Sequence, residues 1–137
     1  MIIYQKELDS SFQAVDKAVK EAEKAFLTLG SWFDSSKRFT TLFLLRELLN
    51  NAVEHGNRFH SDKKVLLQIA LEDFSLQLEV KDEGQGITLP EVNFDSEDQE
   101  NLLRTRNRGY QLLSQLATEI IISDNQVKVR LDFNQED

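Results

Sequence analysis

The sequence predicts a single α+β domain built as a two-layer sandwich, with helices on one face of a mixed sheet. Runs of alternating apolar residues lie near both ends and in the middle of the chain, and runs at helical spacing lie between and beside them. No internal repeat or low-complexity stretch divides the chain. A length of 137 residues with a hydrophobic fraction of 40% is enough for one buried core. We therefore expect residues 1–137 to form one domain.

The overall charge disfavours several classes of partner. The chain has 16 Lys and Arg against 24 Asp and Glu, a net charge of −8, which repels nucleic acid and anionic lipid. It has no apolar run of about twenty residues, the length that a membrane helix needs, and its N-terminus lacks the pattern of a secretory signal. The absence of cysteine excludes disulfides and thiol chemistry. We expect a cytoplasmic protein that contacts neither nucleic acid nor membrane.

The first elements are predicted to be a short strand at residues 2–4 and a long helix after it. Ser10 with Gln13 three residues on is a capping-box pattern, which predicts the start of that helix. Apolar residues continue at helical spacing as far as Leu29, and Gly30 ends the run. This helix is expected to bury its apolar stripe against the sheet.

A second, central helix is predicted to begin at Ser35 or Ser36, either of which can cap it, and to end at Gly56. Trp32 and Phe33, in the connection before it, are expected to pack on the core. On a helix, the apolar residues of this segment fall in one arc, namely Leu42, Leu45, Leu48, Leu49, Ala52 and Val53. The opposite arc presents carboxylates and amides, namely Glu47, Asn50, Asn51 and Glu54.

The second half of the chain is predicted to contain two antiparallel hairpins. Residues 65–71 and 74–80 alternate around a turn, and residues 119–133 alternate around Asp124-Asn125. Residues 88–107 show no period and contain an acidic run, which is typical of a lid or binding loop. Gly109 is expected to open a short third helix.

The first hairpin delivers Asp82, followed by Gly84 and Gly86, to the end of a strand. Two glycines let the backbone come close to a flat ligand, an approach that side chains at these positions would block. The Asp82 carboxylate can accept a hydrogen bond from an exocyclic amine. The same pattern also occurs in ordinary turns, so this stretch alone leaves a plain turn open.

The polar arc of the central helix suits phosphoryl chemistry. Asn51 offers a neutral oxygen to Mg²⁺, which prefers hard oxygen ligands. Glu47, one turn earlier, can accept a proton from a water or hydroxyl that attacks a phosphoryl group. Gly109, at a predicted helix start, offers backbone N–H groups to phosphate. The alternative for this arc is an ordinary solvated helix face.

Three stretches follow one another along nearly the whole chain: Glu47-x-x-x-Asn51-Ala52-x-x-His55, Asp82-Glu83-Gly84-Gln85-Gly86-Ile87 and Arg108-Gly109-Tyr110-Gln111-Leu112-Leu113. In order and spacing they resemble the N box, the G1 box and the G2 region of the GHKL, or Bergerat-fold, ATPases. An N box that begins with Glu rather than Asn is most similar to that of the anti-sigma-factor serine/threonine-protein kinases. The resemblance implies the Bergerat fold and one histidine-kinase-like ATPase domain.

The resemblance also implies ATP and Mg²⁺ as cofactors and a role for each motif residue. Glu47 would be the general base, Asn51 the Mg²⁺ ligand and Asp82 the acceptor for the adenine amine. Residues 88–108 would form the ATP lid. Further nucleotide contacts would come from His55, Gly84, Gly86, Ile87, Arg104, Arg106, Asn107, Arg108 and Gly109.

Two groups of these residues have an ordinary structural alternative. His55 can be a cation that stabilises the C-terminus of the central helix instead of a nucleotide contact. The three arginines of the lid, Arg104, Arg106 and Arg108, can be loop charges that offset the acidic run before them. His60, in a polar loop, is expected to be exposed.

By the resemblance, the protein would phosphorylate a STAS-type anti-anti-sigma protein, hold a sigma factor inactive and form a homodimer. A second hypothesis is a partner-capture module of the same fold with weak or lost ATP binding. Asn107 separates the two, because it stands where the family's G2 region usually has Gly. A third hypothesis, a histidine-kinase catalytic domain, is disfavoured because the chain has no helical dimerisation region with a phospho-acceptor His.

Overall fold

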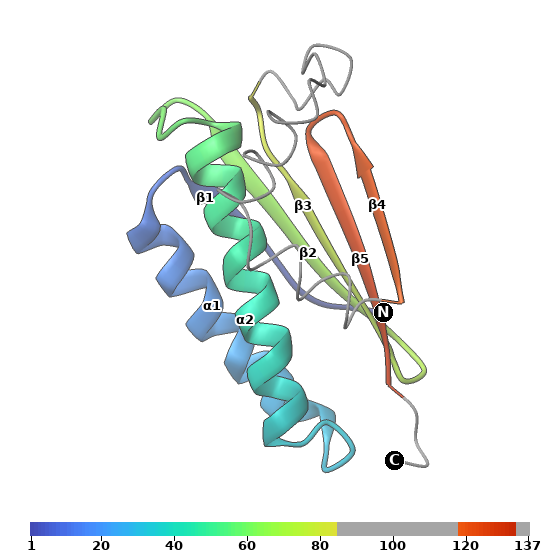
Figure 1. The fold of residues 1–137 in the computed structure, drawn as a ribbon. Helices are drawn as coiled ribbons and strands as arrows, with labels where there is room; N and C mark the ends of the chain where they lie inside the picture. Colours follow the sequence, from blue (N-terminus) through green and yellow to red (C-terminus); the bar gives the residue numbers. More distant parts are fainter. Residues whose placement is uncertain (85–117, 134–137) are drawn as a thin grey trace.

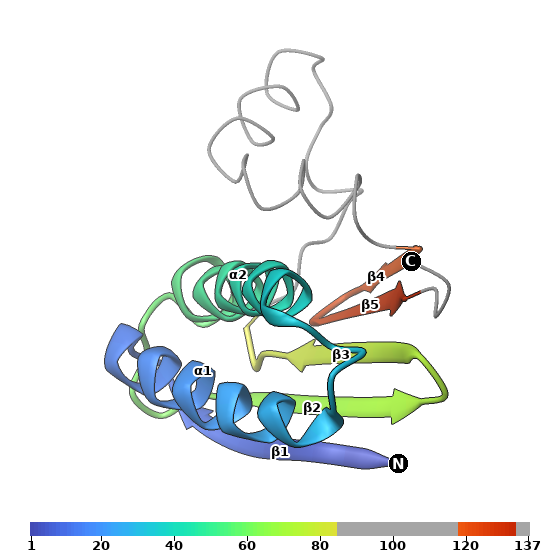
Figure 2. The ribbon, with the colours of Figure 1, turned by 90° about the horizontal axis from the view of Figure 1, so that it is seen from below.

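The structure, a computed structural model, describes residues 1–84 and 118–133, and in them it is an α+β sandwich of two layers. One layer is a five-stranded sheet, and the other consists of helices α1 and α2, which lie side by side on one face of it (Figures 1 and 2). The strands are β1 (Ile2–Asp9), β2 (Lys64–Glu72), β3 (Ser75–Lys81), β4 (Glu119–Ser123) and β5 (Gln126–Asp132). The helical segments are α1 (Phe12–Phe26), η1 (Leu27–Leu29), α2 (Ser35–Asn51) and η2 (Ala52–Gly56). The predicted fold class is confirmed.

The described strands run in the order β1-β2-β3-β5-β4, and every neighbouring pair is antiparallel. The prediction of a mixed sheet is therefore wrong for these strands. The two helices between β1 and β2 explain this arrangement, because each of the four elements reverses the direction of the one before it (Figure 1). Two further connections, β2 to β3 and β4 to β5, are tight hairpins within the described residues, and they also give antiparallel pairs.

The N-terminal strand is longer than predicted and the first helix is capped differently. β1 extends to Asp9 and pairs with β2 along almost its whole length. Ser11, not Ser10, caps α1, with its side chain accepting a hydrogen bond from the N–H of Ala14 at 3.1 Å. The capping-box prediction fails because the Ser10 hydroxyl is buried and donates to the carbonyl of Lys63 instead. The predicted end of this helical run at Gly30 is confirmed.

The second helix is also capped by a different residue than predicted. Asp34 caps α2 by accepting a hydrogen bond from the N–H of Lys37 at 3.0 Å, so neither Ser35 nor Ser36 is the cap. A carboxylate at this position suits the positive end of the helix dipole. The predicted packing of Trp32 and Phe33 is confirmed, since both belong to an aromatic cluster with Phe26, Phe74 and Phe133.

The core lies between the helices and the inner face of the sheet. Alternate residues of each central strand point inward and are buried, as the period of two requires. The inward residues are Val65, Leu67, Ile69, Leu76, Leu78, Val80, Val129 and Leu131. The helices meet them with Val15, Ala18, Val19, Ala22, Phe26, Leu44, Leu45, Leu48 and Leu49. Both predicted hairpins are confirmed.

The C-terminal end of α2, the end of β3 and the turn between β4 and β5 lie at the same edge of the molecule (Figure 1). The backbone N–H of Asp82 donates to the carbonyl of Asn125 at 2.9 Å, which joins β3 to that turn. None of the helices in the described part of the chain is long and apolar enough to cross a membrane. The fold thus brings two of the three sequence motifs towards one edge of the sheet.

Candidate functional site

The central helix ends in a wider turn than the sequence predicted. In η2 the N–H of Asn57 donates to the carbonyl of Ala52, five residues earlier, at 2.8 Å. Such π-helical turns often lie at functional sites. At this end of the helix the backbone enters the left-handed region after Gly56, at Arg58 and Phe59, with φ of 51° and 59°. Gly56 is therefore not needed for the backbone conformation that ends a helix.

Gly56 is instead needed for close packing against the loop that follows β3. A Cβ atom at Gly56 would lie 2.3 Å from Oδ2 of Asp82, and one at Gly84 would lie 2.0 Å from the carbonyl oxygen of Gly56. Both distances are shorter than a real Cβ contact, so a side chain at Gly56 would displace the Asp82 carboxyl and one at Gly84 would displace the backbone of Gly56. The missing side chain of Gly84 makes room for the protein's own backbone, and the predicted approach of a flat ligand to this glycine stays a prediction.

The Asp82 carboxyl is held at the centre of this contact. Its Oδ1 accepts a hydrogen bond from the N–H of Gly84 at 2.8 Å. Burial raises the pKa of the Asp82 carboxyl, while the Gly84 N–H and the positive charge of Lys63 act in the opposite direction. A partly desolvated carboxylate gains more from a new donor than a solvated one does. The position and environment of Asp82 therefore suit the acceptance of an amine.

Two asparagines hold the backbone around Asp82, and the sequence analysis missed both. The buried Asn57 accepts a hydrogen bond from the N–H of Glu83 at 2.8 Å through its Oδ1. Asn125 donates from its Nδ2 to the carbonyl of Gly84 at 2.9 Å. Asn57 directly follows Gly56, and Asn125 lies in a predicted turn, so a helix end and a turn already explain these two residues in the sequence.

The predicted catalytic and metal-binding residues lie on α2 before this turn. Glu47, Asn50 and Asn51 are half-buried, and none of the hydrogen bonds among the described residues involves their side chains. His55 Nε2 lies 3.9 Å from Oε2 of Glu54, and both side chains are substantially exposed. This contact is too long and too solvated to fix either group. His60 is exposed, as predicted.

The remaining predicted contacts lie outside the described residues. They are Gly86, Ile87, Arg104, Arg106, Asn107, Arg108 and Gly109, together with the whole predicted lid at 88–108 and the third helix. Their predicted roles stay predictions. The described members of the predicted nucleotide contacts are Asn51, His55, Asp82 and Gly84. The close packing at Gly56 brings the helical segment of the first two against the loop of the other two.

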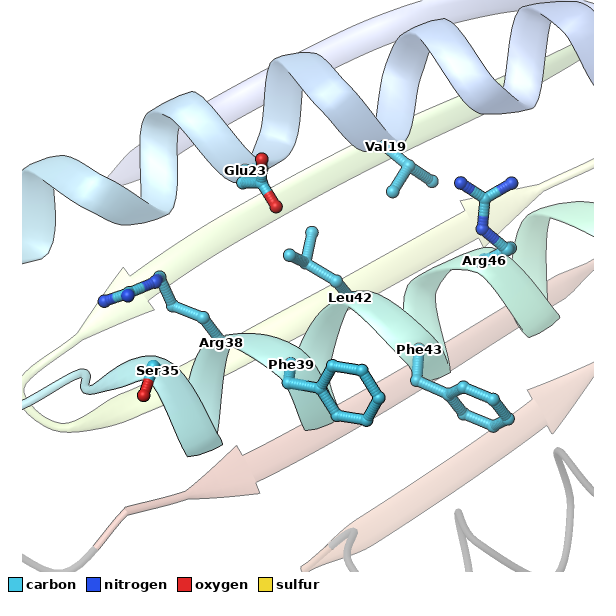
Figure 3. Close-up of a pocket in the computed structure, with 8 residues that line it drawn as sticks. All are labelled: Val19, Glu23, Ser35, Arg38, Phe39, Leu42, Phe43 and Arg46. Carbon is cyan, nitrogen blue, oxygen red and sulfur yellow. The ribbon is translucent and has the colours of Figure 1, made fainter.

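A concave region lies between α1 and α2 and has a volume of about 420 Å³ (Figure 3). Its most exposed large side chain is Phe39, of which 73% is accessible. No residue of the predicted site lines it, and the guanidinium of Arg46, one of its lining residues, pairs with Asp16 of α1. It is lined by Val19, Glu23, Ser35, Arg38, Phe39, Leu42, Phe43 and Arg46. The groove is therefore distinct from the Asp82 site.

The comparison with known families now decides the identity of the fold. Residues 11–133 match the model of the histidine kinase-like ATPase domain. The chain belongs to this family. The match spans α1, both ends of the Gly56–Asp82 contact and the last hairpin, and it confirms the resemblance to the GHKL ATPases at the level of the superfamily. A search of curated proteins found no match.

Membership of this family is consistent with ATP binding and gives the geometry at Asp82 a specific meaning. A histidine kinase-like ATPase domain implies a nucleotide site. Within the chain, the contact of Gly56 with Asp82 and Gly84 is the described feature that joins the N box to the G1 box. The finer assignment to the anti-sigma-factor kinases rests on the sequence resemblance alone.

Proposed function

We propose that this histidine kinase-like ATPase domain is an ATP-dependent protein serine/threonine kinase that regulates transcription by partner switching. In this proposal it phosphorylates a STAS-type anti-anti-sigma protein and holds a sigma factor inactive. The observation that carries the nucleotide part of the proposal is the fixed carboxyl of Asp82, packed against Gly56 at the end of α2. An N box that begins with Glu47 supports the kinase branch.

Each described residue of the site then has one task. Asp82 accepts the amine of adenine, and the Gly84 N–H keeps its other oxygen in place. Glu47, on the half-buried polar face of α2, accepts the proton of the attacking serine or threonine hydroxyl. His55, in η2 directly before Gly56, contributes a further nucleotide contact in this proposal. A general base must first lie within hydrogen-bonding reach of the proton that it accepts, and its pKa matters only once this condition is met.

The residues present fit a magnesium ion that binds together with ATP. No group of three or more His, Asp or Glu side chains among the described residues could hold a metal ion by itself. Mg²⁺ bound with a nucleotide takes most of its ligands from phosphate and water and needs only one or two protein oxygens. Asn51 would supply such an oxygen. When bound, Mg²⁺ neutralises charge on the phosphates.

The proposal also covers location and assembly. We propose a cytoplasmic homodimer, as expected for a partner-switching regulator of transcription. The acidic charge of −8 supports action through proteins rather than by direct binding to nucleic acid. Sedimentation of the purified chain at several concentrations would test the dimer, and a concentration-independent monomer would contradict it.

Two measurements test the function. Calorimetric titration with ATP and Mg²⁺ should show saturable binding, and incubation with a STAS-type protein should transfer phosphate to its Ser or Thr. Binding without transfer to any STAS-type protein would contradict the kinase assignment. No binding of ATP would contradict both parts and favour the partner-capture module, and Asn107→Gly would then be expected to restore affinity.

A further inference from the structure

The loop that carries Asp82 is fixed from two sides by side chains that belong to neither motif. Asn57 directly follows η2, and its Oδ1 accepts a hydrogen bond from the N–H of Glu83 at 2.8 Å. Asn125 approaches from the turn between β4 and β5 and donates to the carbonyl of Gly84 at 2.9 Å. The N–H of Asp82 also donates to the backbone carbonyl of Asn125. The backbones of all three loop residues are therefore held before any ligand binds.

Asn57 is itself held so completely that it has one possible orientation. Its Nδ2 donates to Oγ of Ser10 and to the carbonyl of Lys64, each at 2.9 Å, while its Oδ1 accepts from the loop. Both amide hydrogens and the oxygen are used, and the side chain is fully buried. The loop is further tied by Glu83, whose Oε1 accepts the N–H of Lys64 at 2.8 Å. Buried networks in which every group is satisfied specify one arrangement.

We propose that Asn57 and Asn125 are positioning residues that hold the Asp82 carboxyl in place and thereby set the preference for adenine over a base without an exocyclic amine. This inference rests on the proposed binding of ATP and deepens it. Neither asparagine touches the base. They act through the backbone of residues 82–84, whose geometry fixes the carboxyl by the hydrogen bond from the Gly84 N–H. A hydrogen bond to a base must be held within a fraction of an ångström to discriminate.

The test compares the affinities of ATP and of purine riboside triphosphate, which lacks the amine. The ratio of the two affinities should fall about tenfold or more in Asn57→Ala, because a charge-assisted hydrogen bond is lost or weakened. Asn125→Ala keeps the backbone contact to Asp82 and should lose a smaller part of the ratio. A ratio that stays at the wild-type value in both variants would overturn the proposal.

Ser10→Ala is the matched control. It removes a partner of Asn57 from the same buried network but leaves the contact with Glu83 in place. It should lower stability while the affinity ratio stays near wild type. A ratio that falls equally in Ser10→Ala and Asn57→Ala would mean that loss of stability alone is responsible, which also contradicts the proposal.

Amide hydrogen exchange at the loop gives a readout that needs no nucleotide. The Glu83 amide should be protected in the wild type and should exchange faster in Asn57→Ala, whereas the Asp82 amide should keep its protection. If Asn57→Ala does not fold, Asn125→Ala still decides, because its side chain is half-buried in a turn. A wild type that binds neither nucleotide refutes the proposed function, whereas an unchanged ratio in variants of a binding wild type refutes the positioning role alone.

Discussion

The two ends of the proposed nucleotide site differ in how many hydrogen bonds between described residues hold their functional groups in place. At the Asp82 end, the loop residues are held by Asn57, Asn125 and Gly84, and two glycines allow the backbones to touch. On the face of α2, the side chains of Glu47 and Asn51 make no hydrogen bond to any other described residue. The difference indicates that the described residues preorganise the base end, whereas they do not fix the side chains on the polar face of α2.

Preorganisation of the Asp82 loop affects how much each end of the proposed site contributes to binding affinity and to reaction rate. Ordering a side chain or loop on binding costs conformational entropy, and a loop that is already hydrogen-bonded has largely lost that freedom on folding. The Asp82 loop should therefore contribute affinity and base selectivity. The α2 face should contribute to the rate, because a general base acts in the transition state. Variants at the two ends should separate these effects.

The largest expected effect is on the rate and comes from Glu47→Gln. The substitution keeps the shape of the side chain and removes the proton acceptor, and general-base contributions are typically about 10²–10⁴-fold. Phosphoryl transfer should fall by that factor, while the affinity for ATP stays near wild type because the Asp82 end is intact. Single-turnover transfer to a STAS-type protein, measured beside calorimetry, checks both values. Full activity in the variant would remove Glu47 from the reaction.

The next largest effect is expected at the preorganised end, in Asp82→Asn. Loss of the charged acceptor should weaken ATP binding about 10- to 100-fold, the range of a hydrogen bond to a charged group. Phosphoryl transfer at saturating ATP should change much less, since Glu47 is untouched. Calorimetry on both proteins measures the change. Equal affinities would show that Asp82 does not bind the base and would contradict the division between the two ends.

Gly84→Ala tests the packing that fixes the base end. A Cβ atom would meet the Gly56 carbonyl oxygen at 2.0 Å, so the loop or the end of α2 must move. Overpacking of this kind typically costs about 1–3 kcal/mol of stability, and the displaced Asp82 should also bind ATP less well. Gly30→Ala is the matched control, because Gly30 has φ of 99° but lies far along the chain from both motifs. The control should lose stability and keep its ATP affinity.

The smallest expected effect is a dependence of ATP affinity on pH. Burial raises the pKa of the Asp82 carboxyl in the folded protein, and an amine donor favours its charged form. Affinity should therefore fall as the pH drops through that raised pKa. Because the pKa of the Asp82 carboxyl is higher in the folded than in the unfolded protein, this group favours folding most at a pH below its unfolded pKa. That contribution is lost as the pH rises through the folded pKa. Asp82→Asn should remove this pH dependence of affinity, which titrations at several acidic pH values would show.

Much of the fold could be predicted because its pattern is local. The hairpins of residues 65–80 and 119–133 follow from alternation, and the buried stripes of both helices follow from helical spacing. The errors lie where two local signals compete or where a distant residue decides. Ser10 and Ser11 can both cap a helix. Ser11 is the cap because the Ser10 hydroxyl donates a hydrogen bond to the Lys63 carbonyl and accepts one from Asn57. A one-residue shift of this kind is not visible in the sequence.

The motifs of the proposed site could be named from the sequence, but the residues that hold the Asp82 loop in place could not. Glu47, Asn51 and Asp82 could be named because their chemistry is readable from residue type and spacing. Gly56 was predicted to end a helix, yet the structure shows that a side chain there would collide with the Asp82 carboxyl, which is distant in sequence. Asn57 read as a polar residue after that end, yet its side chain bridges residues 10, 64 and 83. Contacts across more than twenty residues of chain depend on the assembled fold.

The central claim is that ATP binds at the edge where α2 meets the end of β3. A titration of ¹⁵N-labelled protein with ATP and Mg²⁺, followed by amide chemical shifts, tests it most directly. If ATP binds there, saturable shifts are expected at Gly56, Glu83 and Gly84, with further shifts near Asn51 that require Mg²⁺. Shifts confined to the groove of Val19, Phe39 and Phe43, or no shifts at millimolar ATP, would contradict it.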